Sequence, residues 1–207
     1  MRTYLRAAVT ALAVVVLLCA GAGGAMASRS FSTSGGARRG IREIDRDLHL
    51  KLGAIEIICE STMVKDIHSL ISKVAGSLFG FVTDLRFANC RETLGAVATV
   101  RGLIEVPWHI RYQSFTGTLP MITSVLVRIV DAKILITLRP ALCLYRGDIP
   151  MFKTGRTANG SITVTQLTNL RHQVPLFRAL EGSSRCPSEL EFEALYNVEP
   201  AFTLFLA

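Results

Sequence analysis

The spacing of apolar residues changes along this chain, and that change limits the folds open to it. Between residues 64 and 78 apolar residues recur at intervals of three and four, which predicts an amphipathic helix with one narrow apolar seam. Ser61 or Thr62 can cap the start of this helix, and Gly80 marks its end. The seam consists of Val64, Ile67, Ile71, Val74 and Leu78.

From residue 104 the apolar spacing becomes two, which is typical of half-buried strands. Residues 104–112 form the first such strand, and Pro107 predicts that it lies at a sheet edge or a bulge. Residues 121–130 and 133–139 are expected to form a hairpin that turns at residues 131–132, and Asn159-Gly160 predicts a tight turn before a strand at 161–167. The C-terminal residues 189–207 fit a strand or a helix. The expected fold class is therefore α+β, with an amphipathic helix packed on a curved antiparallel meander sheet.

The first 27 residues have the features of a cleavable secretory signal peptide. Arg2 and Arg6 precede an apolar run at residues 9–20, and Ala25-Met26-Ala27 fits the cleavage site. Residues 7–28 are also long enough to span a bilayer, and the Arg- and Ser-rich residues 28–42 are typical of a transit peptide. The weakly apolar Gly/Ala-rich second half and the 22 uncharged residues between Arg6 and Arg29 favour a cleaved signal. We expect a secreted protein with no stable membrane span after cleavage. The alternative is an organelle lumen, reached by a signal followed by a transit-like leader.

The positive charge of the chain is concentrated near its N-terminus. The formal net charge is +7, and six arginines at positions 2, 6, 29, 38, 39 and 42 leave +1 when they are set aside. Residues 28–42 are expected to form a disordered basic arm, and residues 43–207 a single domain. A nucleic-acid surface needs a clustered basic footprint, so no nucleic-acid partner is predicted.

Four cysteines remain after the signal peptide: Cys59, Cys90, Cys143 and Cys186. An even number in an oxidising compartment predicts two disulfides, for which three connectivities exist. We expect Cys59–Cys90 and Cys143–Cys186, because each pair closes a moderate loop, although the spacing leaves the other pairings open. The chain has no C-x-x-C and no histidine at zinc-finger spacing, so no metal site is predicted.

Catalytic motifs do not emerge from the sequence. The chain has no G-x-S-x-G elbow, its clustered glycines belong to the signal peptide, and its four histidines are scattered over polar stretches. We therefore expect a protein that is not an enzyme, with no catalytic residue and no cofactor. Asn159-Gly160-Ser161 matches an N-glycosylation acceptor in a eukaryotic host, and the same residues suit a tight turn.

The middle of the chain resembles a known family in its rhythm of apolar and polar residues. The segments are GSLFGFVTDLRFANC, GLIEVPWHIRYQSFTG, MITSVLVRIVDAKILITL and GSITVTQLTNL, within residues 76–170. Together they resemble the secreted arthropod proteins related to the group 7 mite allergens, in the class of tubular lipid-binding domains that includes the bactericidal/permeability-increasing proteins. The resemblance implies a helix packed in a highly curved antiparallel sheet, around an apolar groove for lipid or another hydrophobic ligand. It implies no catalytic residue.

The function we expect from the sequence is a secreted, non-enzymatic binding protein that holds a lipid or another apolar ligand. The alternative is a secreted protein-interaction or effector domain with a solid core and no small ligand; no particular protein partner is predicted. Pockets for apolar ligands are lined by apolar side chains such as those of the helix seam and the facing strand. The expected lining residues are Val64, Ile67, Ile71, Val74, Leu78, Ile104, Val106, Trp108 and Ile110.

Overall fold

The structure is a computed structural model that describes residues 30–206, apart from 94–97, 104, 106, 120, 139–140, 159 and 182–185. The regular elements of the described residues are all strands. These are β1 (Ser30–Thr33), β2 (Arg38–Leu52), β3 (Ile55–Ile67), β4 (Leu70–Ser72), β5 (Leu78–Glu92), β6 (Ala98–Gly102), β7 (Trp108–Thr118), β8 (Met121–Leu138), β9 (Ala141–Ala158), β10 (Ser161–Glu181) and β11 (Glu189–Leu206).

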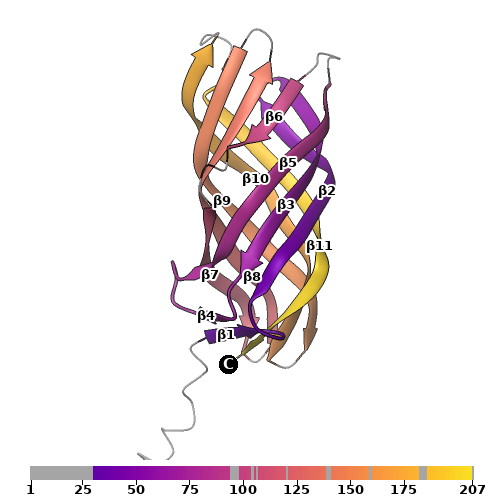
Figure 1. Ribbon diagram of the computed structural model, residues 1–207, viewed down its shortest axis with the longest axis vertical. Helices are drawn as coiled ribbons and strands as arrows, with labels where there is room; N and C mark the ends of the chain where they lie inside the picture. Colours follow the sequence, from indigo (N-terminus) through magenta and orange to yellow (C-terminus); the bar gives the residue numbers. More distant parts are fainter. Residues whose placement is uncertain are drawn as a thin grey trace, which may run out of the picture.

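The strands form one antiparallel sheet that closes on itself (Figure 1). The order runs β10-β9-β8-β7-β5-β3-β2-β11, and pairing of β11 with β10 joins the two ends into a cylinder. Strands β6 and β7 share one position, because β6 pairs with Ile134–Leu138 of β8 and β7 pairs with Met121–Ile129. A closed sheet of about eight strand positions has an interior that side chains can fill, or that holds one small ligand.

The predicted helix at residues 64–78 is wrong, and with it the α+β fold class. Residues 64–67 complete β3, residues 70–72 form β4, and Leu78 begins β5. Alternation of period two continues through β3, whose buried positions are Ile57, Cys59, Ser61, Met63, Lys65 and Ile67. Backbone pairing of β3 with both β2 and β5 outweighs the local spacing of three and four, which arises where three strand segments follow one another.

The hairpin predicted at residues 121–139 is also wrong, because β8 runs through it as one strand. The expected turn is a β-bulge, marked by a register shift between Ile129 and Ala132 and by a positive φ of 57° at Asp131. The side chain of Arg146 donates to Asp131 Oδ2 at 2.7 Å, and Asp148 Oδ1 accepts from the Asp131 N–H at 3.0 Å. Partners on β9 therefore stabilise a conformation that sequence reasoning assigned to a turn.

The disordered arm expected at residues 28–42 does not agree with the structure, in which residues 30–42 contain β1 and the start of β2 paired to distant strands. Other expectations fall close to their predicted places. Strand β7 begins at Trp108, directly after Pro107, and β10 begins at Ser161 as expected; the C-terminal segment is a strand, β11. The signal peptide, Asn159, Ile104 and Val106 lie outside the described residues. Within the part of the chain that the structure describes, no helix is long and apolar enough to cross a bilayer.

A small sheet made of β1 and β4 lies across one end of the cylinder (Figure 1), and we call it the cap. Strand β1 pairs with the end of β11 on one side and with β4 on the other. The cap buries Phe31 and Ile71 completely, and the Phe31 ring lies 5.9 Å from Tyr112 and 6.3 Å from Phe115. Aromatic packing of this kind attaches the cap to β7.

Candidate ligand site inside the closed sheet

Three charged side chains meet inside the cylinder. Glu43 of β2, Lys65 of β3 and Lys153 of β9 have no solvent exposure. Each occupies an inward position of its strand, in phase with buried apolar neighbours such as Met63 and Met151. Lysine and glutamate are almost never fully buried unless they are paired, so this cluster is the most unusual feature of the interior.

Glu43 is the partner that both lysines share. Lys65 Nζ forms an ion pair with Glu43 Oε2, and Lys153 Nζ donates to Oε1 at 3.3 Å. Lys153 Nζ also lies 5.4 Å from the ring centroid of Phe79 and 5.5 Å from that of Phe202, which is cation–π distance. Two aromatic rings thus flank Lys153 inside the cylinder.

Burial and the neighbouring charges shift the pKa values of the cluster. Burial alone would raise the pKa of Glu43, but the two lysines more than offset it, and the pKa lies below its usual value. Burial lowers the pKa of Lys65 from 10.5 to about 8; Glu43 opposes this shift and the nearby Lys153 adds to it. The charges that act on Lys65 are therefore one anion and one competing cation.

When all three groups are ionised, the cluster carries one net positive charge in a dry interior. An ion transferred from water to a low-dielectric interior costs several kcal/mol unless a counter-charge compensates it. Glu43 can balance one lysine only. One further anionic group next to the two ammonium groups would balance the remaining charge.

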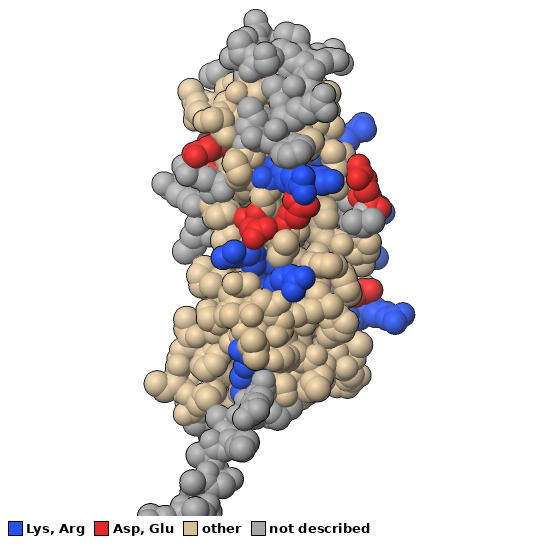
Figure 2. Space-filling model, turned by 90° about the vertical axis from the view of Figure 1, so that its left-hand side faces the viewer, with Lys and Arg blue, Asp and Glu red and all other residues tan. Residues whose placement is uncertain are grey.

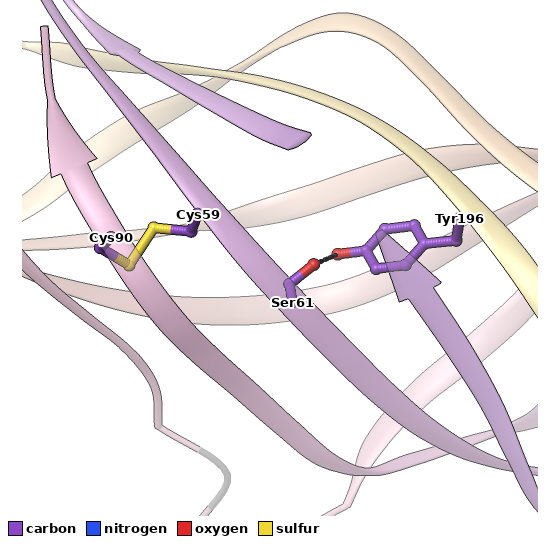
Figure 3. The surroundings of a disulfide bond; sticks show 4 residues. All are labelled: Cys59, Ser61, Cys90 and Tyr196. Carbon is purple, nitrogen blue, oxygen red and sulfur yellow. Dashed lines mark hydrogen bonds between the residues drawn. A yellow bond between two sulfur atoms is a disulfide. The ribbon is translucent and has the colours of Figure 1, made fainter. Parts of the chain in front are cut away.

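Further polar groups lie beside the cluster. Ser61 Oγ donates to Tyr196 Oη at 3.0 Å, and the two side chains point toward one another from β3 and β11 (Figure 3). Burial raises the pKa of Tyr196, so the phenol stays protonated. Asn169 of β10 is 1% exposed and its amide nitrogen has no hydrogen-bond partner. An unpartnered buried amide offers a second polar contact to a bound molecule.

Both predicted disulfides are confirmed. Cys59–Cys90 links β3 to β5 beside the Ser61–Tyr196 pair (Figure 3), with 4.1 Å between the Cα atoms. Cys143–Cys186 links β9 to the segment before β11, with a Cα separation of 5.6 Å. Each bond joins strands that hold the inward-facing cluster or its neighbours. Two such disulfides fit a protein of an oxidising compartment.

The residues that the sequence nominated as ligand-lining do not form one surface. Ile67 and Ile110 meet across β5, because both pair with Gly80, and Ile71 and Trp108 are also buried in the core. Val64 and Leu78 are half-buried, and Val64 lies on the outward side of β3, while Val74 is 68% exposed.

Sequence reasoning missed Glu43, Lys65 and Lys153. The helix predicted at residues 64–78 included Lys65, and no role was predicted for Glu43 or Lys153. A usable signal existed, namely a charge in phase with apolar residues, as in Met63-x-Lys65-x-Ile67 and Ile149-x-Met151-x-Lys153.

Two shallow depressions are bordered by described residues. One, of about 200 Å³, lies where β6 gives way to β7 and is bordered by Leu103, Pro107 and Lys133. The other, of about 260 Å³, lies beside Lys51 and Pro187. Among the described residues, no group of three or more His, Cys, Asp or Glu side chains is arranged to hold a metal ion.

Comparisons with known proteins do not place this chain in a family. No family model and no curated protein matches it. A solved structure, DynF from the dynemicin biosynthesis pathway of Micromonospora chersina, aligns with a TM-score of 0.34 and 10% identity, over 86% of this chain and 81% of that one. A likeness of that size carries no functional argument.

Proposed function

We propose that this protein is a secreted, non-enzymatic binding protein that holds an apolar ligand with an acidic group, such as a long-chain carboxylate, inside the closed sheet. The observation that carries the proposal is the buried cluster of two lysines around one glutamate, with both lysine side chains at 0% exposure. A ligand carboxylate beside Lys65 and Lys153 would balance the remaining positive charge. Hydrogen bonds between ammonium and carboxylate groups are among the strong ones in proteins.

The surroundings of the cluster suit the apolar part of such a ligand. Phe79 and Phe202 flank Lys153, and the inward positions of β8 and β9 are apolar around it. Binding sites of this kind combine an apolar wall with a few placed polar groups that orient the ligand. Asn169 and the Ser61–Tyr196 pair supply neutral polar groups one step along the cylinder.

The test compares a fatty carboxylate with its uncharged ester in vesicle-free buffer. We would titrate the protein with cis-parinaric acid and with its methyl ester, and follow ligand fluorescence. The acid should bind at least about tenfold more tightly than the ester, which corresponds to roughly 1.4 kcal/mol. Lys65→Met should remove most of this preference, because the variant loses the excess charge.

A matched surface variant controls for general charge effects. Lys51 lies outside the cylinder with a third of its side chain exposed, near Glu56 and Glu191. Lys51→Met should therefore leave the preference for the acid unchanged. Equal binding of acid and ester by the native protein would overturn the proposal.

A protein-interaction domain with a solid core is the second candidate. It is favoured by the complete burial of large inward side chains such as Tyr145, Phe192 and Phe202. Native mass spectrometry of the protein secreted from eukaryotic cells separates the two. A dissociable adduct of lipid size supports the carrier, while a bare mature mass together with no parinarate binding supports the interaction domain.

A further inference from the structure

Exposed apolar side chains gather at the capped end of the cylinder. Among the described residues, six large apolar side chains are well exposed, and five of them lie at this end. Their exposed fractions are 62% for Leu70, 68% for Val74, 43% for Leu119, 45% for Met121 and 42% for Phe205. The sixth, Leu195, lies on the outer wall of β11, where it pairs with Thr168.

These five residues lie at the same end of the cylinder, and we call them the apolar tip. Ser32 of β1 pairs with Leu70 of β4 on one side and with Phe205 of β11 on the other, so the two apolar side chains flank it across the cap. Leu119 and Met121 lie where β7 connects to β8, and Phe115 of β7 packs with its ring 6.3 Å from Phe31 of the cap. Large exposed apolar patches mark interaction sites in soluble proteins.

Basic side chains surround the apolar tip. Arg38 and Arg39 begin β2 beside the cap, Lys73 follows β4 with its Nζ 5.0 Å from the Phe31 ring, and Arg156 lies near the end of β9. The acidic residue nearest to the cap along β3, Asp66, accepts a hydrogen bond from the Gly40 N–H at 3.0 Å. On the face shown in Figure 2, no acidic side chain is visible at the capped end. The charge at this end is therefore mainly positive.

We infer that the capped end docks on an anionic lipid bilayer, with the apolar tip in the interface and the surrounding arginines and lysine at the headgroups. Apolar side chains that enter the headgroup boundary, together with basic residues that attract anionic lipid, produce reversible binding to a membrane surface. The biological role of this docking rests on the proposed function: the cap would face the bilayer from which an acidic lipid enters the cylinder.

The experiment measures co-sedimentation of the protein, recovered from the medium of eukaryotic cells, with lipid vesicles and no added ligand. Vesicles of phosphatidylcholine with phosphatidylserine are compared with vesicles of phosphatidylcholine alone. The native protein should bind the anionic vesicles at least tenfold more strongly, and added salt should weaken that binding. Leu70→Glu combined with Phe205→Glu should reduce the partition by at least tenfold.

Leu195→Glu is the matched control, because it places the same charge on an exposed apolar position away from the tip. It should sediment with anionic vesicles as the native protein does. Arg38→Gln combined with Arg156→Gln should lose the preference for phosphatidylserine. Native protein that stays in the supernatant with both vesicles would overturn the inference in favour of a protein partner at this end. Equal loss of binding in Leu195→Glu would overturn it as well.

The two proposals can fail separately. Parinarate binding is measured without vesicles, and the substitutions at the apolar tip lie outside the interior cluster. The double variant Leu70→Glu, Phe205→Glu should therefore bind parinarate as the native protein does, while its binding to vesicles is reduced. If the native protein binds vesicles but not parinarate, the docking inference stands and the proposed acidic ligand is excluded.

Discussion

Glu43 interacts with more positive charge than it can balance, and the effect of removing each member of the cluster should differ accordingly. Lys65 and Lys153 both depend on this carboxylate inside the cylinder. Breaking a buried ion pair from one side leaves an uncompensated charge, whereas removal of a surplus charge does not. The stability of the protein should therefore depend on which charge is removed.

Glu43→Gln should lower the free energy of unfolding by about 3–5 kcal/mol, because two buried ammonium groups lose their counter-ion. Lys65→Met should raise it at neutral pH, by up to about 3–4 kcal/mol, since the variant no longer buries the surplus charge while Glu43 keeps Lys153. Urea denaturation monitored by circular dichroism measures both values. Similar losses in the two variants would contradict the assigned charge balance.

The lowered pKa of Lys65 predicts a rise of stability with pH. Between about 8 and the unfolded value of 10.5 the folded protein binds fewer protons than the unfolded chain, so the free energy of unfolding increases with pH. The full rise is on the order of 3–4 kcal/mol at 1.36 kcal/mol per pKa unit. Below pH 8 the cost of the buried charge is fully present.

Denaturation between pH 8 and pH 9.5 should reveal this rise as a difference between the native protein and Lys65→Met. The upper limit matters because burial raises the pKa of Tyr145 to about 12. Ionisation of the unfolded tyrosine near pH 10 therefore lowers stability. A native protein and a Lys65→Met variant with parallel pH profiles would rule out the titration of Lys65.

At the scale of elements, the disulfides and the β-bulge of β8 hold strands in register. The bulge at Asp131 depends on partners from β9, Arg146 and Asp148, rather than on a local turn signal. The Cys143–Cys186 bond spans 43 residues and attaches β9 to the start of β11. It therefore acts near the seam where the last strand closes the sheet.

Cys143→Ser combined with Cys186→Ser should lower the free energy of unfolding by about 2–4 kcal/mol, because the unfolded chain regains the entropy of an open loop. The bulk of the closed sheet should persist, since the hydrogen-bonded pairing of β10 with β11 does not depend on the bond. Thermal unfolding of the oxidised native protein beside the double variant gives the difference. A change below about 0.5 kcal/mol would mean that the bond adds little to the native fold.

For the whole molecule, closure by β11 is the decisive event. This strand pairs with β10 on one side and with β2 on the other, and it thereby closes the sheet into a cylinder. Without β11, the long strands β2 and β10 would both present unpaired edges, which promote aggregation.

Truncation after Ser188 should therefore prevent formation of a soluble monomer. Size-exclusion chromatography and near-ultraviolet circular dichroism of the truncated chain would show aggregates without fixed aromatic packing. A full-length Leu195→Ser variant, altered only on the outer wall of β11, should elute as the native protein does. A monomeric truncated chain with a native near-ultraviolet spectrum would show that closure is dispensable.

Some of the fold could be predicted because the relevant signals are local. Alternation of apolar residues over 104–112 predicted a strand, and β7 begins within that range, at Trp108. The Asn159-Gly160 pair marked the start of β10 at Ser161, and loop length suggested the two disulfides that the structure contains. The helix at 64–78 failed because its spacing spans β3, β4 and β5, where hydrogen bonds to distant strands override local periodicity.

By itself the sequence determined the even set of cysteines and the apolar alternation within β7, β8 and the start of β10, because alternation depends on residues close together in the chain. Only the tertiary structure decided that the sheet closes, that Asp131 lies in a bulge and that Glu43 meets Lys65 and Lys153. Lys153 lies 110 residues from Glu43 along the chain. A charge that looks solvated in a single strand becomes a buried ion only when the cylinder closes around it, and that closure depends on pairings between distant strands.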